Sequence, residues 1–189
     1  SLHQATPHEV ARMVLDEQAE IGMATESLAD YPDLVTLPCY EWEHVLVVPP
    51  SHPLATKERI GLDDLAIEPL ITYHPSFTGR NKIDAAFAAR QLHPRVVLEA
   101  IDSDVIKTYV RLGLGVGIVA EMAMREDPGV DLVARPLGHL FGQSVARVAF
   151  KRGAYLRNFV YKFAETLSDR LSRDLIIRAM QGEPSDYSL

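Results

Sequence analysis

The sequence predicts an α/β fold, because short apolar runs with strand character alternate with amphipathic helical stretches along its 189 residues. Residues 102–120 predict this most clearly, since they read as a helix, a glycine turn and a strand in succession. Asp102 is a short acceptor suited to a helix N-cap, and Gly113 stands where a helix ends in a left-handed residue. Residues 116–120 are apolar throughout, which is typical of a strand in a parallel sheet that helices cover on both faces.

The first part of the chain is predicted to contain a helix, then strands, then a loop. Thr6 followed by Glu9 is the pattern of a capping box, and Pro7 suits the first helical position, so a helix begins here. Runs rich in apolar and β-branched residues predict strands over residues 21–25, 34–40 and 44–48. The prolines of residues 49–53 predict a loop.

The middle of the chain continues the alternation of helices and strands. A short helix is expected over residues 62–66, and strands are expected over residues 70–73 and 96–100. Between those strands, residues 74–80 form a turn that leads into a helix. The helix that opens residues 102–120 has an expected buried face at helical spacing: Val105, Ile106, Tyr109 and Val110.

The last third of the chain is predicted to be strand first and helix afterwards. A turn is expected at residues 127–129, strands over residues 132–134 and 144–150, a helix over residues 173–180 and a frayed polar tail from Gly182. Before the last helix lies a longer amphipathic one. Its expected buried stripe consists of Leu156, Phe159, Val160, Phe163 and Leu167.

No Pro/Gly-rich linker divides the chain, so any two lobes must be joined by ordinary strands. The best candidate crossings lie near residues 39–43 and 140–144. This predicts one lobe of residues 41–143 and a second lobe made from residues 1–40 and 144–189.

Composition excludes several classes of function. The net charge of −7 and the lack of a basic run make the chain a poor nucleic-acid binder by itself. No apolar run approaches the length of a membrane span. The single cysteine, Cys39, rules out an internal disulfide and fits a reducing compartment, which predicts a cytoplasmic protein. Its apolar neighbours favour inert packing over a reactive thiol.

Motifs for catalysis or metal binding do not occur. The seven histidines show no metal-ligand spacing, and no Gly-x-Ser-x-Gly elbow is present. The glycines at 113, 115 and 117 follow a helix and precede a strand, the reverse of the order in a dinucleotide-binding loop. An enzyme is therefore not expected, and neither is a metal site.

The best candidate binding site lies in residues 76–80, at the start of a predicted helix. Free backbone N–H groups and the helix dipole favour an anion at such a position. The hydroxyls of Ser76 and Thr78 would add neutral donors, and Gly79 would let the backbone approach closely. Arg80 would supply charge or simply point to solvent. The alternative interpretation is a helix start that binds no ligand.

Two further positions are candidates for the same ligand. Thr25 ends a predicted strand, and ligands in open parallel sheets bind beyond the carboxyl ends of strands. Thr25 could thus face Thr78 across a cleft, or merely terminate its strand. Residues 102–104 open a helix, where repulsion of an anion argues against the two carboxylates and leaves Ser103. Trp42 is interpreted as packing rather than as a ligand stack.

Several segments together resemble the cysteine-regulon branch of the LysR-type transcriptional regulators. They are residues 24–26, 37–40, 77–80, 104–117 and 150–152, and the likeness extends from about His3 to about Asp174. The segment 104–117 is specific to that branch, whereas its glycine turn alone is typical of LysR-type regulators broadly.

The resemblance implies a two-lobed effector-binding domain like a periplasmic binding protein, with the effector between the lobes. The implied effector is sulfate, a related sulfur compound or an acetylserine inducer, with no further cofactor. The family's sulfate-contacting threonines would map to Thr25 and Thr78. The resemblance also implies homo-oligomers, either dimers or tetramers. Contacts with promoter DNA and RNA polymerase are implied only through a full-length protein.

The chain departs from the family pattern in two places. A Thr-x-Thr-Gln strand that supplies the family's remaining contacts has no counterpart, and neither has the winged helix-turn-helix domain. We therefore expect an incomplete terminal lobe and no DNA-binding domain in these residues. His74 and Pro75 replace smaller or apolar residues before the candidate site, which bears on ligand preference. The alternative function is a periplasmic-type anion-binding protein for transport.

Overall fold

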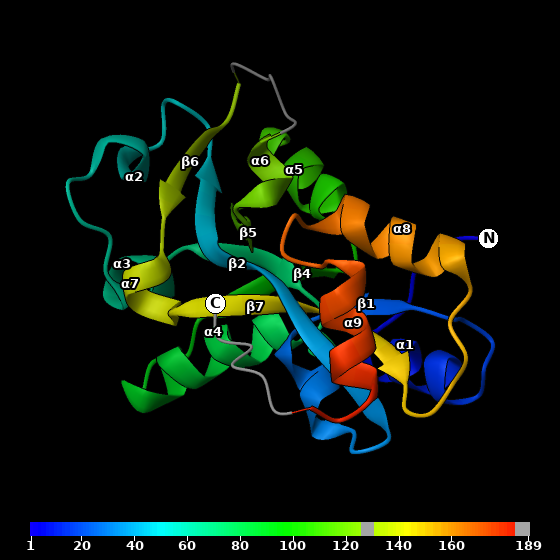
Figure 1. Ribbon diagram of the computed structural model, residues 1–189. Coiled ribbons are helices and arrows are strands. Elements are labelled where there is room, and N and C mark those ends of the chain that lie inside the picture. Colours follow the sequence, from blue (N-terminus) through cyan, green and yellow to red (C-terminus); the bar gives the residue numbers. More distant parts are fainter. Residues whose placement is uncertain (126–130, 184–189) are drawn as a thin grey trace. The chain divides into compact units, whose positions relative to one another are not determined.

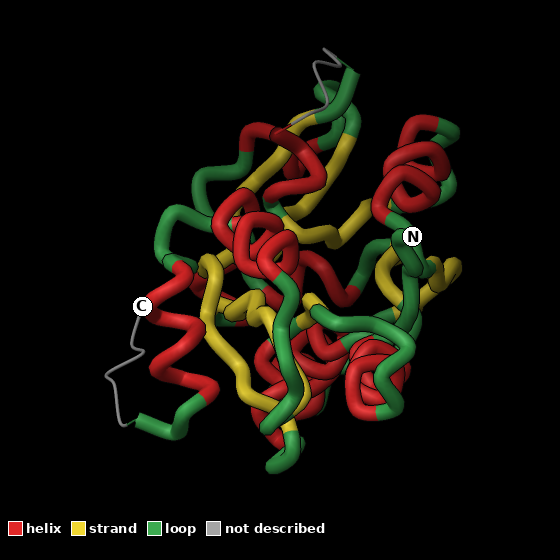
Figure 2. The backbone as a smooth tube through the Cα atoms, turned by 45° about the vertical axis from the view of Figure 1, so that its right-hand side comes forward, coloured by secondary structure: helices red, strands yellow, loops and turns green. Residues whose placement is uncertain are grey.

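A computed structural model of the chain describes residues 1–125 and 131–183 (Figure 1). The chain divides into two compact units, which are described separately. Unit 1 consists of Ser1–Glu41 and Ser144–Leu189, and unit 2 consists of Trp42–Gln143. The helices and strands alternate along the chain, which confirms the predicted α/β class (Figure 2). The turn expected at residues 127–129 and the tail beyond residue 183 lie outside the described residues.

Unit 1 opens with helix α1 (Pro7–Leu15), which begins where the capping box predicts. The backbone N–H of Thr6 donates to Glu9 Oε2 at 2.8 Å, and the N–H of Glu9 donates to Thr6 Oγ1 at 3.4 Å. Strand β1 (Gly22–Ala24) and the 3₁₀ helix η1 (Glu26–Asp30) follow. α1 and η1 bury Ala11, Val14 and Leu28 in a small core.

The rest of unit 1 is a short sheet with two C-terminal helices. β1 pairs antiparallel with β7 (Gln143–Lys151), and β7 neighbours β2 (Leu34–Val48). Helices α8 (Asn158–Leu167) and α9 (Arg173–Met180) pack onto β2 and β7 through a shared core. That core includes Leu37, Phe150, Val160 and Ile176.

The predicted buried stripe of α8 is wrong in part. Val160 and Ala164 are fully buried, whereas Phe159 and Phe163 are 53% and 45% exposed. The two aromatic residues precede the buried pair by one position, which turns them about 100° away from the core. The Arg157 guanidinium lies over the Phe159 ring at 4.6 Å, so this side chain is covered by a cation instead.

Strand β2 is continuous, whereas the sequence predicts two strands separated at residues 41–43. Figure 1 shows it as one long strand. The boundary between units 1 and 2 falls within this strand, between Glu41 and Trp42. Two acidic residues flank Trp42, and these acids interrupt the apolar pattern from which two strands were predicted. The Trp42 side chain is nevertheless buried, so the strand does not end there.

Unit 2 is built on a mixed sheet. β3 (Pro69–Tyr73) runs parallel to its two neighbours, β4 (Arg95–Ala100) and β5 (Val116–Ala120). β2 pairs antiparallel with β5 and with β6 (Val133–Pro136). The expected mostly parallel sheet is thus limited to the three strands β5, β3 and β4.

Helices cover both faces of the unit 2 sheet. Leu70 packs with Ile83 and Phe87 of α4 (Thr78–Ala89), whereas the next strand residue, Ile71, packs with Ile106 of α5 (Ser103–Arg111). Because alternate strand residues point to opposite faces, α4 and α5 lie on opposite sides of the sheet. The shorter helices are α2 (Pro53–Thr56), α3 (Leu62–Ala66), α6 (Met122–Arg125) and α7 (Gly138–Phe141).

The order of helix, glycine turn and strand predicted for residues 102–120 is confirmed. Asp102 caps α5 by accepting from the N–H of Asp104 at 2.7 Å, and Gly113 has a φ of +75°. The predicted helix face is partly wrong, since Ile106 and Val110 are buried but Val105 and Tyr109 are 41% and 38% exposed. Within the described residues, no helix has the length and apolar character needed to cross a membrane.

Candidate functional site

The candidate site lies at the carboxyl edge of the parallel strands in unit 2. β5, β3 and β4 are adjacent and parallel, so their carboxyl ends lie at one edge of the sheet. α4 follows β3 and α5 follows β4, so both helices begin just beyond that edge. Open α/β sheets bind their ligands in this region. The structure thus brings five predicted residues to one edge: Ser76, Thr78, Gly79, Arg80 and Ser103.

The start of α4 has no side-chain cap and no acid in its first turn. Its N-cap residue is Phe77. The turn before it is held by His74, whose Nδ1 accepts from the N–H of Ser76 at 3.2 Å and lies 3.0 Å from Ser76 Oγ. The helix dipole and the N–H groups of Thr78 and Gly79 are therefore not offset by an acid in the first turn of the helix.

Gly79 lets the first turn of α4 approach strand β2 closely. A Cβ atom at this position would lie 3.0 Å from His44 Nε2 and 3.2 Å from the Trp42 ring. Both rings are buried, and they meet edge to face with centroids 5.0 Å apart. Trp42 therefore packs against the first turn of α4 at Gly79.

Arg80 is committed to protein groups and does not point to solvent. Its side chain is 9% exposed, and Nε donates to Asp84 at 2.7 Å. Nη1 donates to the Tyr73 carbonyl at 2.9 Å and to Glu99 Oε1 at 2.8 Å. These bonds tie the first turn of α4 to the last residue of β3 and to β4. Direct contact of Arg80 with an effector stays a prediction.

The start of α5 is linked to the same strand end through Tyr73. The Tyr73 hydroxyl lies 2.7 Å from Ser103 Oγ and accepts from the N–H of Ala120 at 3.0 Å. Burial raises the pKa of Tyr73, so its hydroxyl stays protonated at neutral pH. Sequence reasoning identified Ser103 but missed Tyr73, which shows no local signal beyond its place at the end of a predicted strand.

Thr25 belongs to unit 1, where it precedes η1 directly after strand β1. Its Oγ1 lies 3.2 Å from Ser27 Oγ. The neighbouring Glu26 accepts from the N–H of Val145 at 3.3 Å. Thr25 thus stands at a strand terminus, as its local sequence indicates. The pairing of Thr25 with Thr78 across a cleft stays a prediction.

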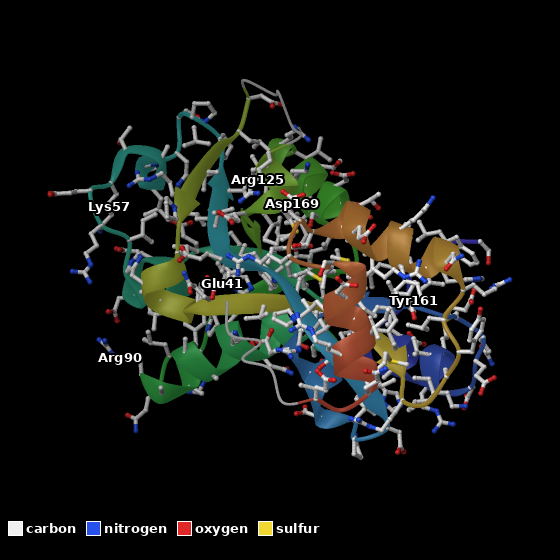
Figure 3. All side chains as sticks on the ribbon, in the orientation of Figure 1. Glu41, Lys57, Arg90, Arg125, Tyr161 and Asp169 are labelled. Atoms are coloured by element: carbon white, nitrogen blue, oxygen red, sulfur yellow. The ribbon has the colours of Figure 1, made fainter. Side chains whose placement is uncertain are left out.

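Several cations away from the candidate site form ion pairs with acids. In unit 2, Lys57 contacts Asp64 at 2.7 Å and Arg90 lies 3.7 Å from Asp63. Figure 3 shows the side chains of Lys57 and Arg90 extending outward from the ribbon. In unit 1, Lys151 pairs with Glu17 and Arg157 pairs with Glu20.

Metal and thiol chemistry find no support in the described part of the chain. Residues 1–125 and 131–183 contain no group of three or more His, Cys, Asp or Glu side chains placed to hold an ion. Cys39 is 2% exposed, and burial raises the pKa of its thiol. A buried, protonated thiol is unreactive, which fits the packing role expected for Cys39.

Comparison with known proteins shows close relatives among transcriptional regulators. The HTH-type transcriptional regulator CysB of Burkholderia cenocepacia is 53% identical over 189 residues, covering 100% of this chain and 60% of that protein. The regulator SsuR of the same organism is 46% identical over 172 residues, covering 91% of this chain and 56% of that protein. The chain thus spans less than two thirds of their length.

Solved structures agree with these relatives. The cofactor-binding domain of the Cbl transcriptional regulator superposes with a TM-score of 0.86 at 42% identity, covering 95% of this chain and 79% of that one. The resemblance to cysteine-regulon LysR-type regulators is confirmed by these matches. Since such relatives are regulators, they also agree with the expectation that the chain is not an enzyme. The LysR substrate binding domain family matches residues 1–172, and the chain belongs to this family.

Proposed function

We propose that this chain is the effector-sensing domain of a regulator of sulfur metabolism, and that it binds sulfate or an acetylserine-type inducer. The binding region is the carboxyl edge of β5, β3 and β4 in unit 2. The observation that carries the proposal is the start of α4, which has no acid in its first turn and no capping side chain. The similarity to CysB and SsuR supports a sulfur-related effector.

The chemistry of the α4 start suits an oxyanion that carries no proton. Sulfate is fully ionised at neutral pH and can only accept hydrogen bonds. The N–H groups of Thr78 and Gly79 and the hydroxyl of Thr78 are donors. The Ser76 hydroxyl donates to His74 Nδ1, and it would have to turn from this partner to contact the anion. Hydrogen bonds to a charged partner contribute about 1.5–3 kcal/mol each, so a few of them suffice for micromolar affinity.

A specific observation keeps the acetylserine-type ligand as a second candidate. The start of α5 is acidic, since Asp102 caps the helix and Asp104 lies in its first turn. A zwitterionic amino acid derivative could place its carboxylate at the start of α4 and its ammonium group toward Asp102. Sulfate has no ammonium group and would gain nothing from Asp102.

The role of the whole protein follows from its relatives as a proposal, because the chain spans 60% or less of CysB and SsuR. Both are named HTH-type regulators, so the effector signal would reach promoter DNA through a helix-turn-helix domain outside these residues. The effector would act by shifting the population of two arrangements of a cytoplasmic homo-oligomer. These regulator relatives favour this function over the transport alternative.

A titration of the 189-residue chain tests the proposal. Isothermal calorimetry with sulfate, thiosulfate, O-acetylserine and adenylyl sulfate should give specific binding for at least one ligand, and a matching rise in melting temperature. Thr78→Val should weaken binding by at least about tenfold, because one hydrogen bond to a charged partner is lost. Thr108→Val removes an exposed hydroxyl from α5, where it bonds the Asp104 carbonyl, and should leave the affinity unchanged.

A chimera tests the regulatory part of the proposal. Residues 1–189 would replace the matching segment of the Burkholderia cenocepacia CysB protein, to which they are 53% identical. The chimera should respond in a promoter-binding assay to the ligand that the calorimetry selects, and Thr78→Val should shift the response to higher ligand concentration. If no ligand binds the chain or alters the chimera, the proposed function is wrong.

A further inference from the structure

One hydroxyl group joins three segments at the carboxyl edge of the unit 2 sheet. Tyr73, the last residue of β3, places its hydroxyl 2.7 Å from Ser103 Oγ at the start of α5 and 3.0 Å from the N–H of Ala120 at the end of β5. The carbonyl of the same residue accepts from Arg80 in the first turn of α4. Tyr73 therefore contacts both helix starts at which the proposed effector binds.

The direction of the hydrogen bond between Tyr73 and Ser103 follows from their partners. The Ala120 N–H can only donate, so the Tyr73 oxygen accepts there. The Tyr73 proton then needs an acceptor, and Ser103 Oγ is the acceptor within reach among its described contacts. Because burial raises the pKa of Tyr73, this proton is present across the physiological range. Ser103 Oγ thus accepts a hydrogen bond from the Tyr73 hydroxyl, and the Ser103 hydroxyl is left to donate to another group.

We propose that Tyr73 is a positioning residue that holds the Ser103 hydroxyl as a hydrogen-bond donor toward the effector. The inference rests on the proposed function, because it assigns Ser103 to the same binding region. Hydrogen bonds in such a chain polarise one another, so a Ser103 hydroxyl that accepts from Tyr73 is also a stronger donor.

Local charge explains why the direction of the Ser103 hydroxyl matters. Asp102 caps α5 at 2.7 Å from the N–H of Asp104, and its negative charge opposes an anion at this position. Lys107 is buried, and its ammonium group contacts Asp104 at 2.8 Å and the Ala123 carbonyl at 2.9 Å. The cation is therefore engaged by the protein. A donating Ser103 hydroxyl gives a ligand oxygen a favourable contact in these acidic surroundings.

A double-mutant cycle on the 189-residue chain tests the inference. The affinity for sulfate or O-acetylserine, whichever the unmodified chain binds, is measured for Tyr73→Phe, Ser103→Ala and the double variant. We expect each single variant to bind about three- to tenfold more weakly, because one hydrogen bond to the ligand is lost or misdirected. The double variant should bind no more weakly than Ser103→Ala, because Tyr73 acts through Ser103.

Controls separate a positioning role from a structural one. Tyr31→Phe removes a hydroxyl that contacts His8 Nδ1 at 2.7 Å in unit 1, and it should leave the affinity unchanged. Ser103→Thr keeps the hydroxyl. With Tyr73 present it should bind the ligand nearly as tightly as the unmodified chain does, and more tightly than Ser103→Ala. Combined with Tyr73→Phe, it should bind no more tightly than Ser103→Ala. Circular dichroism and melting temperature report whether each variant is folded.

The outcomes are distinguishable. If the unmodified chain binds neither ligand, the proposed function fails and this inference falls with it. If it binds but Ser103→Ala has unchanged affinity, the inference alone is overturned, even where Tyr73→Phe does not fold. If Tyr73→Phe weakens binding by the same factor with and without Ser103, Tyr73 acts on the structure generally and the inference is wrong.

Discussion

The starts of helices α1 and α4 differ in how their backbone N–H groups are satisfied. At α1, Thr6 and Glu9 bond each other's backbone, and the carboxylate of Glu9 offsets the helix dipole. At α4, Phe77 provides no side-chain cap and the first turn has no acid. A start like that of α1 is complete within the protein and repels anions, whereas a start like that of α4 is suited to receive one.

An acid placed in the first turn of α4 should remove the difference between the two helix starts. Thr78→Asp places a carboxylate in the first turn, where the dipole should stabilise the helix by about 0.3–1 kcal/mol. The same charge would lie near a bound anion. Two like charges about 6 Å apart repel by about 3 kcal/mol at an effective dielectric constant of about 20, roughly a hundredfold in affinity. Calorimetry should therefore show binding lost while the free energy of unfolding is kept or raised.

A charge control accompanies that variant. Ser172→Asp changes the N-cap of α9 in unit 1, where Ser172 Oγ accepts from the N–H of Leu175 at 3.2 Å. Aspartate is an equally good cap, so this variant adds the same charge without touching the candidate site. It should bind sulfate as the unmodified chain does. Equal losses for both variants would show that net charge, and not the α4 start, controls affinity.

The Arg80 guanidinium anchors the start of α4 to β3 and β4. Arg80→Lys keeps a positive charge but cannot bond Asp84, Glu99 and the Tyr73 carbonyl together. We expect the free energy of unfolding to fall by about 1 kcal/mol, a modest value because both carboxylates are partly exposed. Urea denaturation measures this change.

The matched control for Arg80 is an exposed arginine at the opposite end of the same helix. Arg90 caps the C-terminus of α4, is 64% exposed and lies 3.7 Å from Asp63. Arg90→Lys should change the free energy of unfolding by less than about 0.5 kcal/mol. Equal effects at the two positions would contradict the anchoring role of Arg80.

Local signals explain which parts of the fold were predictable. The helix, turn and strand of residues 102–120 are encoded by a cap at Asp102, a left-handed Gly113 and a continuous apolar run, all within a few residues of each other. The exposure of Phe159 was not predictable in this way. Which side of an apolar helix faces the core depends on strands that lie far away in the sequence.

In the candidate site too, residues in a local sequence pattern were predictable, and residues brought together by strand pairing were not. Thr78 and Gly79 could be identified because a helix start with hydroxyls and glycine is a local pattern. The anchors could not, since Arg80 reaches Glu99 and Tyr73 reaches Ala120 through strand pairing. Only the parallel register of β3, β4 and β5 brings those residues to one edge.

The smallest expected effect is the loss of the Glu9 carboxylate at the start of α1. The hydrogen bond from the Thr6 N–H lowers the pKa of Glu9 below its ordinary value of 4.5. A carboxyl group whose pKa is lower in the folded state stabilises that state fully above its ordinary pKa. This contribution is lost as the pH falls through the lowered value. Glu9→Gln should therefore reduce the urea midpoint slightly at pH 7, and the difference from the unmodified chain should vanish near pH 2.

The corresponding expectation at α4 is that no such acid-dependent contribution exists, because its first turn carries no acid. Thr78→Asp should create one, so that its gain in stability at pH 7 disappears in acid as the new carboxylate is protonated. If the stability of Thr78→Asp showed no dependence on pH, the α4 dipole would be satisfied by other groups. The start of α4 would then be closed like that of α1, and its assignment as an anion site would lose its physical basis.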